Sequence, residues 1–208
     1  MVNWFLKGGI FMWPLLACSV LGVAFFLERI VTLFLSRTNP KKFVENLEEA
    51  IRKGGVKEGI EFCEKNRSPV ARILSKGLLK YSESGNPGGK KERIEEAITS
   101  SGITELAFLD RGMWVLSSVV TLAPLLGFLG TVSGMIHAFD AIALAGEVEP
   151  TLVASGISEA LITTEAGLSI AFPLFFAYNF FNVKINSYTR DMEEASNHLI
   201  DFLVEKGG

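Results

Sequence analysis

Three long apolar segments dominate the chain. The first has no charged side chain from residue 8 to 27, and the second and third cover 112–145 and 151–183. The apolar pattern of the first resumes after Glu28-Arg29 and continues to residue 35, so each segment is longer than the roughly 20 residues that a helix needs to cross a bilayer. We therefore predict an all-α membrane protein with three transmembrane helices, over 10–35, 112–145 and 151–183. A cleaved signal peptide is the alternative for the first segment, but its apolar centre would be only about 7–15 residues long.

The segments between and after these spans have the period of amphipathic helices. Turn-forming residues divide 36–111, at Asn39-Pro40, Gly54-Gly55, Ser68-Pro69 and 84–89. Between them, apolar residues recur at helical spacing: Phe43, Leu47, Ile51, Val70, Ile73, Leu74 and Leu78. The tail, 184–208, continues with a heptad-like seam of Ile185, Tyr188, Met192, Ala195, Leu199 and Phe202. We predict that these long helical extensions of the spans form one compact bundle.

The sequence also predicts how the segments are joined. Residues 146–150 are expected to form a tight turn in which Pro150 opens the third span. From Lys90 the helical pattern runs into the second span, with Gly102 as the one weak point. We therefore expect one continuous helix to leave the membrane there.

The distribution of charge gives the orientation. All 20 Lys and Arg residues lie outside 112–183, fifteen lie within 37–111, and none lies in 146–150. By the positive-inside rule, 36–111 and 184–208 are cytoplasmic, whereas 1–9 and 146–150 are periplasmic. With 23 acidic residues and a net charge of −3, the chain has no basic field for nucleic acid. We therefore expect membrane lipid around the spans and no nucleic-acid partner.

The second and third spans each contain a stripe of small residues. We assign helix packing and the lining of a pore to six of them: Gly127, Gly130, Gly134, Ala160, Gly167 and Ala171. Thr131 and Thr164 share these faces and lie 15 and 14 residues from the 146–150 turn, which predicts matching depths about 20 Å from it. The two hydroxyls can form a polar ring in an oligomer, or each can bond to its own backbone.

Two carboxylates, Glu159 and Glu165, fall in the third span, and no Lys or Arg in either adjacent helix offsets them. A charged carboxylate at the bilayer centre costs about 2.5–3.5 kcal/mol, so such a residue is a functional candidate. Each must be protonated, face water, or be bonded by a hydroxyl such as that of Thr163 or Thr164. Their spacing of six residues places them on different faces. We predict that Glu165 contacts an aqueous route and that Glu159 contacts that route or a neighbouring helix.

The motifs of these spans resemble the TolQ/ExbB/MotA proton-channel family. The resemblance rests on Leu125-Leu-Gly-Phe-Leu-Gly-Thr-Val-Ser-Gly134, on Ile157-Ser-Glu-Ala-Leu-Ile-Thr-Thr164 with Ala166-Gly-Leu168, and on Pro173 with Tyr178-Asn179. The first span, with Met12-Trp-Pro14 and Glu28-Arg29, also matches, so the whole chain is covered. Three spans with an outward N-terminus are similar to the ExbB and TolQ branches rather than to the four-span MotA branch.

The resemblance implies a homopentameric ring in the bacterial inner membrane. Such a ring surrounds a single-span ExbD/TolR-like partner whose membrane aspartate carries the proton. Thr131 and Thr164 match the family's pore threonines, and Glu159 matches its third-span glutamate. The proton-motive force would energise outer-membrane transport or envelope maintenance through a TonB/TolA-like periplasm-spanning protein. Glu165 departs from the usual pattern, which leaves open whether the ion is a proton or sodium.

Other classes of function fit the sequence less well. A passive membrane scaffold that anchors the cytoplasmic helices is the main alternative. A secondary transporter would need an inverted repeat, which three spans do not supply. We expect no enzyme activity, catalytic residue, cofactor or metal site, because the chain has no phosphate-binding loop or metal-ligand spacing. Cys18 and Cys63 are expected to be inert packing residues.

Overall fold

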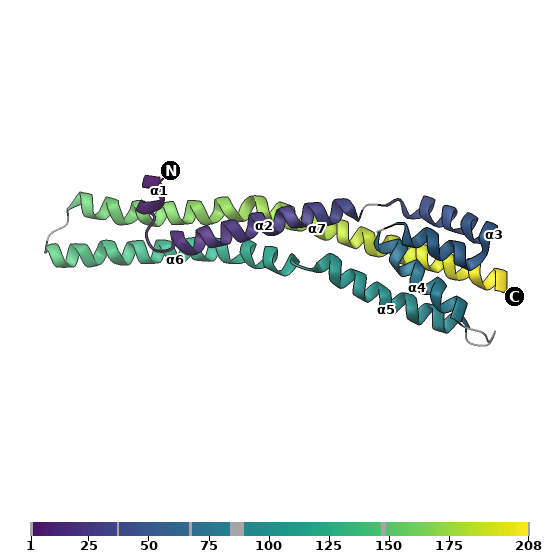
Figure 1. Cartoon of the computed structure of the whole chain (residues 1–208). Coiled ribbons are helices and arrows are strands. Elements are labelled where there is room, and N and C mark those ends of the chain that lie inside the picture. The colour runs from purple at the N-terminus through teal and green to yellow at the C-terminus, as the bar shows by residue number, and fades with distance from the viewer. Residues whose placement is uncertain (1, 37, 67, 84–89, 147–148, 208) are drawn as a thin grey trace. The chain divides into compact units, whose positions relative to one another are not determined.

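The computed structural model describes residues 2–36, 38–66, 68–83, 90–146 and 149–207. The regular elements of these residues are α-helices: α1 (Val2–Lys7), α2 (Met12–Leu35), α3 (Pro40–Glu64), α4 (Pro69–Glu83), α5 (Lys90–Asp110), α6 (Met113–Ala145) and α7 (Pro150–Gly207). They divide into two units (Figure 1). Unit 1 comprises Met1–Arg29 and Gly112–Phe180, and unit 2 comprises Ile30–Arg111 and Phe181–Gly208.

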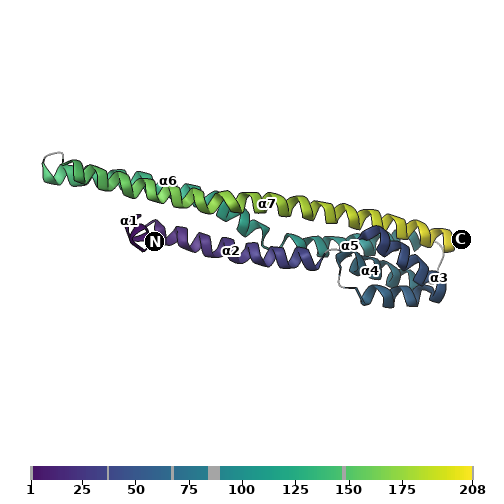
Figure 2. The ribbon, with the colours of Figure 1, turned by 90° about the horizontal axis from the view of Figure 1, so that it is seen from above.

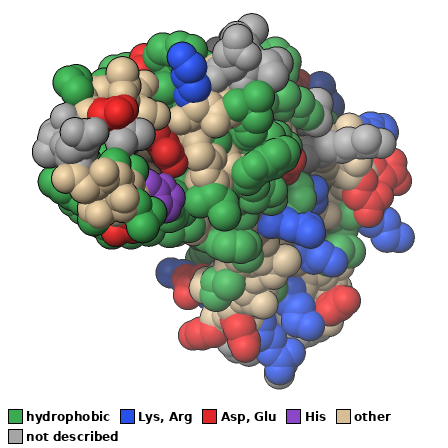
Figure 3. Space-filling view, turned by 90° about the vertical axis from the view of Figure 1, so that its left-hand side faces the viewer, with side chains coloured by type: hydrophobic (Ala, Val, Ile, Leu, Met, Phe, Trp, Pro, Cys, Tyr) green, Lys and Arg blue, Asp and Glu red, His purple; other side chains and the backbone are tan. Residues whose placement is uncertain are grey.

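Three of the helical stretches are long and apolar enough to cross a membrane, as the sequence predicts. They are Met12–Phe34, Lys91–Ala145 and Val153–Glu205. In the most apolar part of the first stretch, only 17% of the residues are buried within the chain. The corresponding share is 33% in each of the other two stretches. Most of their apolar side chains therefore face outward, and Figure 3 shows hydrophobic side chains gathered in patches among polar and charged ones. Such a surface requires lipid or further protein around it.

The core of unit 1 is formed by α2, α6 and the first part of α7. Leu15 of α2 packs with Ala123 of α6 and Ala171 of α7, and all three are buried. Near the other end of this part of α2, the Arg29 guanidinium pairs with the Glu28 carboxylate through two contacts of 2.6 Å. The sequence allowed this pairing, which neutralises a cation that is only 1% exposed.

The expected continuous helix into the second span is wrong. α5 ends at Asp110 and α6 begins at Met113, because Gly112 has a left-handed backbone with φ of 86°. A β-carbon at Gly112 would lie 2.8 Å from the Phe25 ring, so this corner also needs a residue without a side chain. Gly102, the suspected weak point, lies inside α5.

Unit 2 is a helix bundle, in agreement with the amphipathic pattern. Its buried residues include all seven of the apolar positions predicted within 36–111. From the tail of α7 it buries Ile185, Met192, Ala195 and Leu199, while the Tyr188 hydroxyl donates a hydrogen bond to the Leu33 carbonyl oxygen at 2.9 Å. The predicted heptad seam is thus a packing face.

The predicted helix ends are largely confirmed. The Asn39 side chain accepts a hydrogen bond from the Lys42 backbone N–H and caps α3, and Pro40 opens that helix. Gly55 kinks α3 at a φ of 75°, and Pro69 and Pro150 open α4 and α7. The turn expected at 84–89, and residues 147 and 148 of the turn at 146–150, lie outside the described residues.

Cys63 is expected to resist alkylation while unit 2 is folded. Burial, followed by the charge of Glu64, raises the pKa of its thiol to about 12, so at pH 8 only about one thiol in 10,000 is the reactive thiolate. In a Cys18→Ser variant, mass spectrometry after iodoacetamide treatment should find Cys63 unmodified in native protein and modified after denaturation. Below the raised pKa, the slow native rate should increase about tenfold per pH unit. Complete labelling of native protein at pH 8 would contradict this assignment.

Candidate functional site

α6 and α7 lie side by side in unit 1, and their backbones touch along a seam of small residues (Figures 1 and 2). A β-carbon at Gly167 would lie 2.5 Å from the Ala123 carbonyl oxygen, and one at Gly127 would lie 3.0 Å from the Thr163 carbonyl oxygen. All six small residues that the sequence assigned to this stripe are buried. Gly156 lies outside the predicted stripe but also belongs to the seam, because its absent side chain makes room for Ala138.

Thr131 and Thr164 are both half-buried and lie at the edge of this seam, where the Thr164 α-carbon would be 3.1 Å from a β-carbon at Gly127. The Thr131 hydroxyl donates to the Phe128 carbonyl oxygen at 2.6 Å within α6. The Thr164 hydroxyl donates across to the Gly127 carbonyl oxygen of α6 at 3.1 Å. Each hydroxyl therefore satisfies a backbone carbonyl in the single chain, and each keeps a lone pair available.

The two threonines are not at matching depth. Thr164 is level with Gly127, which lies four residues, or about 6 Å, along α6 from Thr131. The close contacts of Gly167 with Ala123 and of Gly156 with Ala138 fix this register. Counting from the turn missed the offset because the fit of the small residues, not equal numbers of residues, aligns the two helices.

Thr163 is the threonine that lies within the seam. It is 1% exposed, its side chain packs against Gly130, and its hydroxyl donates to the Ala160 carbonyl oxygen at 2.8 Å. The sequence offered Thr163 and Thr164 as hydrogen-bond donors to the membrane carboxylates. That interpretation is wrong, since both hydroxyls bond to backbone carbonyl oxygens. The role of Thr163 could have been predicted from Gly130, because a glycine on the facing helix leaves space for a β-branched side chain.

Glu159 lies on the face of α7 that meets the N-terminal segment. Its side chain is 27% exposed, and its carboxylate contacts Gly9 in the corner between α1 and α2. Oε1 of Glu159 lies 4.0 Å from Nδ1 of His137 on α6. In the sequence, Asp140 follows His137 by three residues, which is the spacing of a pair on one helix face. In the structure, the carboxylate that reaches His137 is that of Glu159.

Glu165 lies in a different environment from Glu159, as expected from the prediction that the two residues lie on different faces of the helix. Its side chain is exposed in the single chain. It shares one face of α7 with Leu161, Leu168 and Phe172, which are 62%, 55% and 69% exposed. Glu165 is thus a carboxylic acid within an apolar face that points away from the chain's own core.

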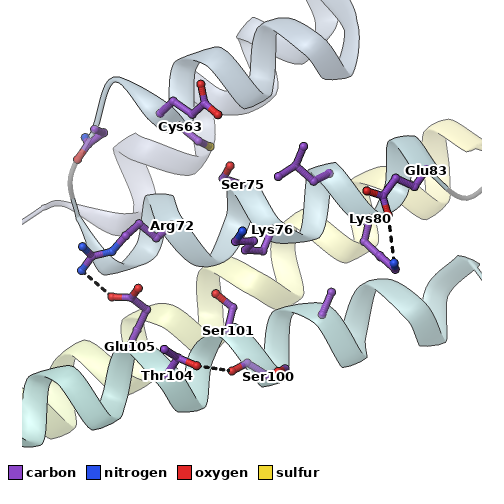
Figure 4. Close-up of a pocket in the computed structure, with 14 residues that line it drawn as sticks. Cys63, Arg72, Ser75, Lys76, Lys80, Glu83, Ser100, Ser101, Thr104 and Glu105 are labelled. Atoms are coloured by element: carbon purple, nitrogen blue, oxygen red, sulfur yellow. Dashed lines mark hydrogen bonds and ion pairs between the residues drawn. The ribbon is translucent and has the colours of Figure 1, made fainter.

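Unit 2 contains a cavity of about 890 Å³ whose walls carry charged side chains (Figure 4). It is lined by residues of α4 and α5 and by Cys63 and Glu64 of α3. Arg72 lies 2.6 Å from Glu105, and Lys80 lies 3.1 Å from Glu83, so these wall charges are paired. None of the residues predicted for an ion pathway is among the described residues that line it. We therefore place the candidate site in unit 1.

Comparison with known proteins gives the class of this chain. A model of the MotA/TolQ/ExbB proton channel family matches residues 65–194, which is more than half of the sequence. This is a family of channels, not of enzymes. Together with the three candidate spans, the match defines a multi-pass membrane protein. The chain belongs to the MotA/TolQ/ExbB proton channel family.

Curated relatives place it near the ExbB proteins. It is 35% identical over 196 residues to a putative ExbB-like biopolymer transport protein of Synechocystis, covering 91% of this chain and 72% of the relative. It is 27% identical to the biopolymer transport protein ExbB of Neisseria gonorrhoeae, over 92% of this chain and 89% of that protein. A putative ExbB homologue of Methanothermobacter thermautotrophicus is 29% identical over 88% of this chain, which spans 63% of that relative's length.

Proposed function

We propose that this chain is the ion-conducting stator subunit of a machine that uses the proton-motive force to energise outer-membrane transport or envelope maintenance. In this proposal it forms a homopentameric ring in the bacterial inner membrane. The N-terminus and the 146–150 turn are periplasmic, and the C-terminus is cytoplasmic. Thr131, Thr164, Glu159 and Glu165 belong to the ion pathway.

The observation that carries the proposal is the position of Glu165. An exposed carboxylic acid within the apolar face of Leu161, Leu168 and Phe172 is unfavourable in lipid. No Lys or Arg occurs anywhere in 112–183 to neutralise it. The cost is removed if this face of α7 lines a hydrated interior in a ring of subunits, where the acid can exchange protons.

The partner in this proposal is a single-span protein of the ExbD/TolR type. Biopolymer transport in the names of the curated relatives supports a role in driving a periplasm-spanning protein of the TonB/TolA type. The predicted membrane aspartate of the single-span partner would receive the ion from the ring. A partner helix inside the ring would also cover apolar surface that the single chain leaves exposed.

A passive scaffold remains the second candidate, and one observation favours it. The hydroxyls of Thr131 and Thr164 both bond to backbone carbonyl oxygens, as they would if they served only packing. On this hypothesis the spans anchor unit 2, and the carboxylates of α7 have no role in transport.

Proton flux in reconstituted vesicles distinguishes these functions. We expect Glu165→Gln, in vesicles that contain the chain and its single-span partner, to lower the flux driven by an imposed membrane potential. The decrease should be about 100-fold, the scale expected when a proton-transferring side chain is lost. Replacing sodium with choline in the buffers should leave the wild-type flux unchanged if the ion is a proton.

Glu149→Gln is the matched control, because Glu149 is exposed, immediately precedes α7 and lies before the apolar stretch. It should retain wild-type flux. Equal flux for the wild type, Glu165→Gln and Glu159→Gln would exclude the channel and favour the scaffold.

A further inference from the structure

The corner between α1 and α2 contacts the part of α7 that carries Glu159. Backbone hydrogen bonds close this corner, from the Gly8 N–H to the Trp4 carbonyl oxygen at 3.2 Å and from the Met12 N–H to the Gly9 carbonyl oxygen at 3.3 Å. The rings of Phe5 and Trp13 meet edge to face across it, with centroids 5.2 Å apart. The corner is therefore held by contacts on both of its sides.

Gly8 and Gly9, which have no side chains, are residues of the corner that meet α7. A β-carbon at Gly9 would collide with the carboxylate of Glu159, and one at Gly8 would lie 3.0 Å from a methyl group of Ile162. Glu159 and Ile162 are three residues apart and so share a face of the helix. The Glu159 carboxylate thus occupies the space that a side chain at residue 9 would need.

Backbone conformation alone does not account for this contact. Gly9 has a φ of 68°, which favours glycine wherever it occurs. Gly146 has a nearly identical φ of 73°, yet a β-carbon there would meet, apart from its chain neighbours, no atom of the described residues within 4 Å. Both glycines have a left-handed backbone conformation, but of the two only Gly9 contacts an ionisable side chain of unit 1.

We propose that Gly9 is a positioning residue for Glu159. The bare backbone at this corner lets the carboxylate lie against it, within 4.0 Å of His137 Nδ1 and between the N-terminal segment and α6. A side chain at position 9 pushes the carboxylate out of this place. The inference rests on the proposed function, because it concerns how the ion pathway holds one of its acids.

The test uses the full chain with its single-span partner in vesicles and measures proton flux from pH 5 to 8. Gly9→Ala is compared with Gly146→Ala, which imposes the same backbone strain without the contact. We expect Gly9→Ala to lower flux by at least about threefold more than Gly146→Ala does, and to change the shape of the pH profile. Equal effects of the two variants would overturn the positioning role.

A shorter acid supplies the rescue. Glu159→Asp withdraws the carboxylate by one methylene group, which makes room for the methyl group of Gly9→Ala. The double variant should therefore conduct better than Gly9→Ala alone, and additive losses would overturn the proposal. If Gly9→Ala does not accumulate in the membrane, the amount of protein in the membrane is measured in place of flux. The double variant should then accumulate to a higher level than Gly9→Ala alone, and additive losses of protein would overturn the proposal.

The failure of this inference is distinguishable from that of the proposed function. Wild-type flux in Glu159→Gln would remove Glu159 from the ion pathway whatever Gly9→Ala does. A strong loss in Glu159→Gln, combined with equal effects of Gly9→Ala and Gly146→Ala, would keep the pathway and reject only the positioning role.

Discussion

Replacing Gly167 with alanine is expected to destabilise the chain, although alanine is the better helix former. The new β-carbon would lie 2.5 Å from the Ala123 carbonyl oxygen and 3.2 Å from the Gly127 α-carbon. Both atoms belong to the backbone of α6, so relief requires the two helices to separate. Overpacking of this kind costs about 1–3 kcal/mol, more than the gain of about 1 kcal/mol in helix propensity. The measurement is the thermal unfolding midpoint of the detergent-solubilised protein.

Gly102→Ala is the matched control for this substitution. Gly102 also lies inside a helix, and the nearest atom to a β-carbon there is the Ile73 Cδ1 methyl at 4.0 Å, which is an ordinary contact. This variant should gain up to about 1 kcal/mol from helix propensity. Opposite signs for the two glycines are the expected result. A higher midpoint for Gly167→Ala would show that α6 and α7 pack less closely than described.

Leu74→Ala should cause a large loss of stability in unit 2. Leu74 has an exposed fraction of 0% in the core of the bundle. Truncation removes buried apolar surface and leaves a cavity, with a cost of about 2–5 kcal/mol. The rate at which a protease cleaves unit 2 in the solubilised full chain should rise accordingly.

Leu79→Ala, on the same helix, is the control for Leu74→Ala. Leu79 is only half-buried and lines the open cavity of Figure 4. Its truncation creates no enclosed void, so the increase in cleavage should be much smaller. Similar cleavage rates for the two variants would contradict the packing of α4.

The small-residue motifs illustrate how far sequence reasoning reaches within the candidate site. The spacing of Gly127, Gly134 and Gly167 predicted surfaces suited to close helix contact, and these residues are buried in the α6–α7 seam. The same spacing did not distinguish Thr163 from Thr164. Neighbouring positions on a helix differ by only 100°, so either can lie at the edge of a wide face. The atoms of the partner helix decide which one is enclosed.

The sequence by itself determined three apolar spans, amphipathic helices between and after them, and two uncompensated acids on different faces of the third span. These features follow from local composition and helical period, which every residue carries regardless of its distant neighbours. The tertiary structure alone decided the offset of Thr131 and Thr164, the break at Gly112 and the contact of Glu159 with Gly9. Each depends on a contact between segments distant in sequence: the α6 backbone against the α7 backbone, Gly112 against the Phe25 ring, and Gly9 against the Glu159 carboxylate. Such a contact is set by where a residue without a side chain meets its neighbour, which neither segment carries in its own composition or helical period.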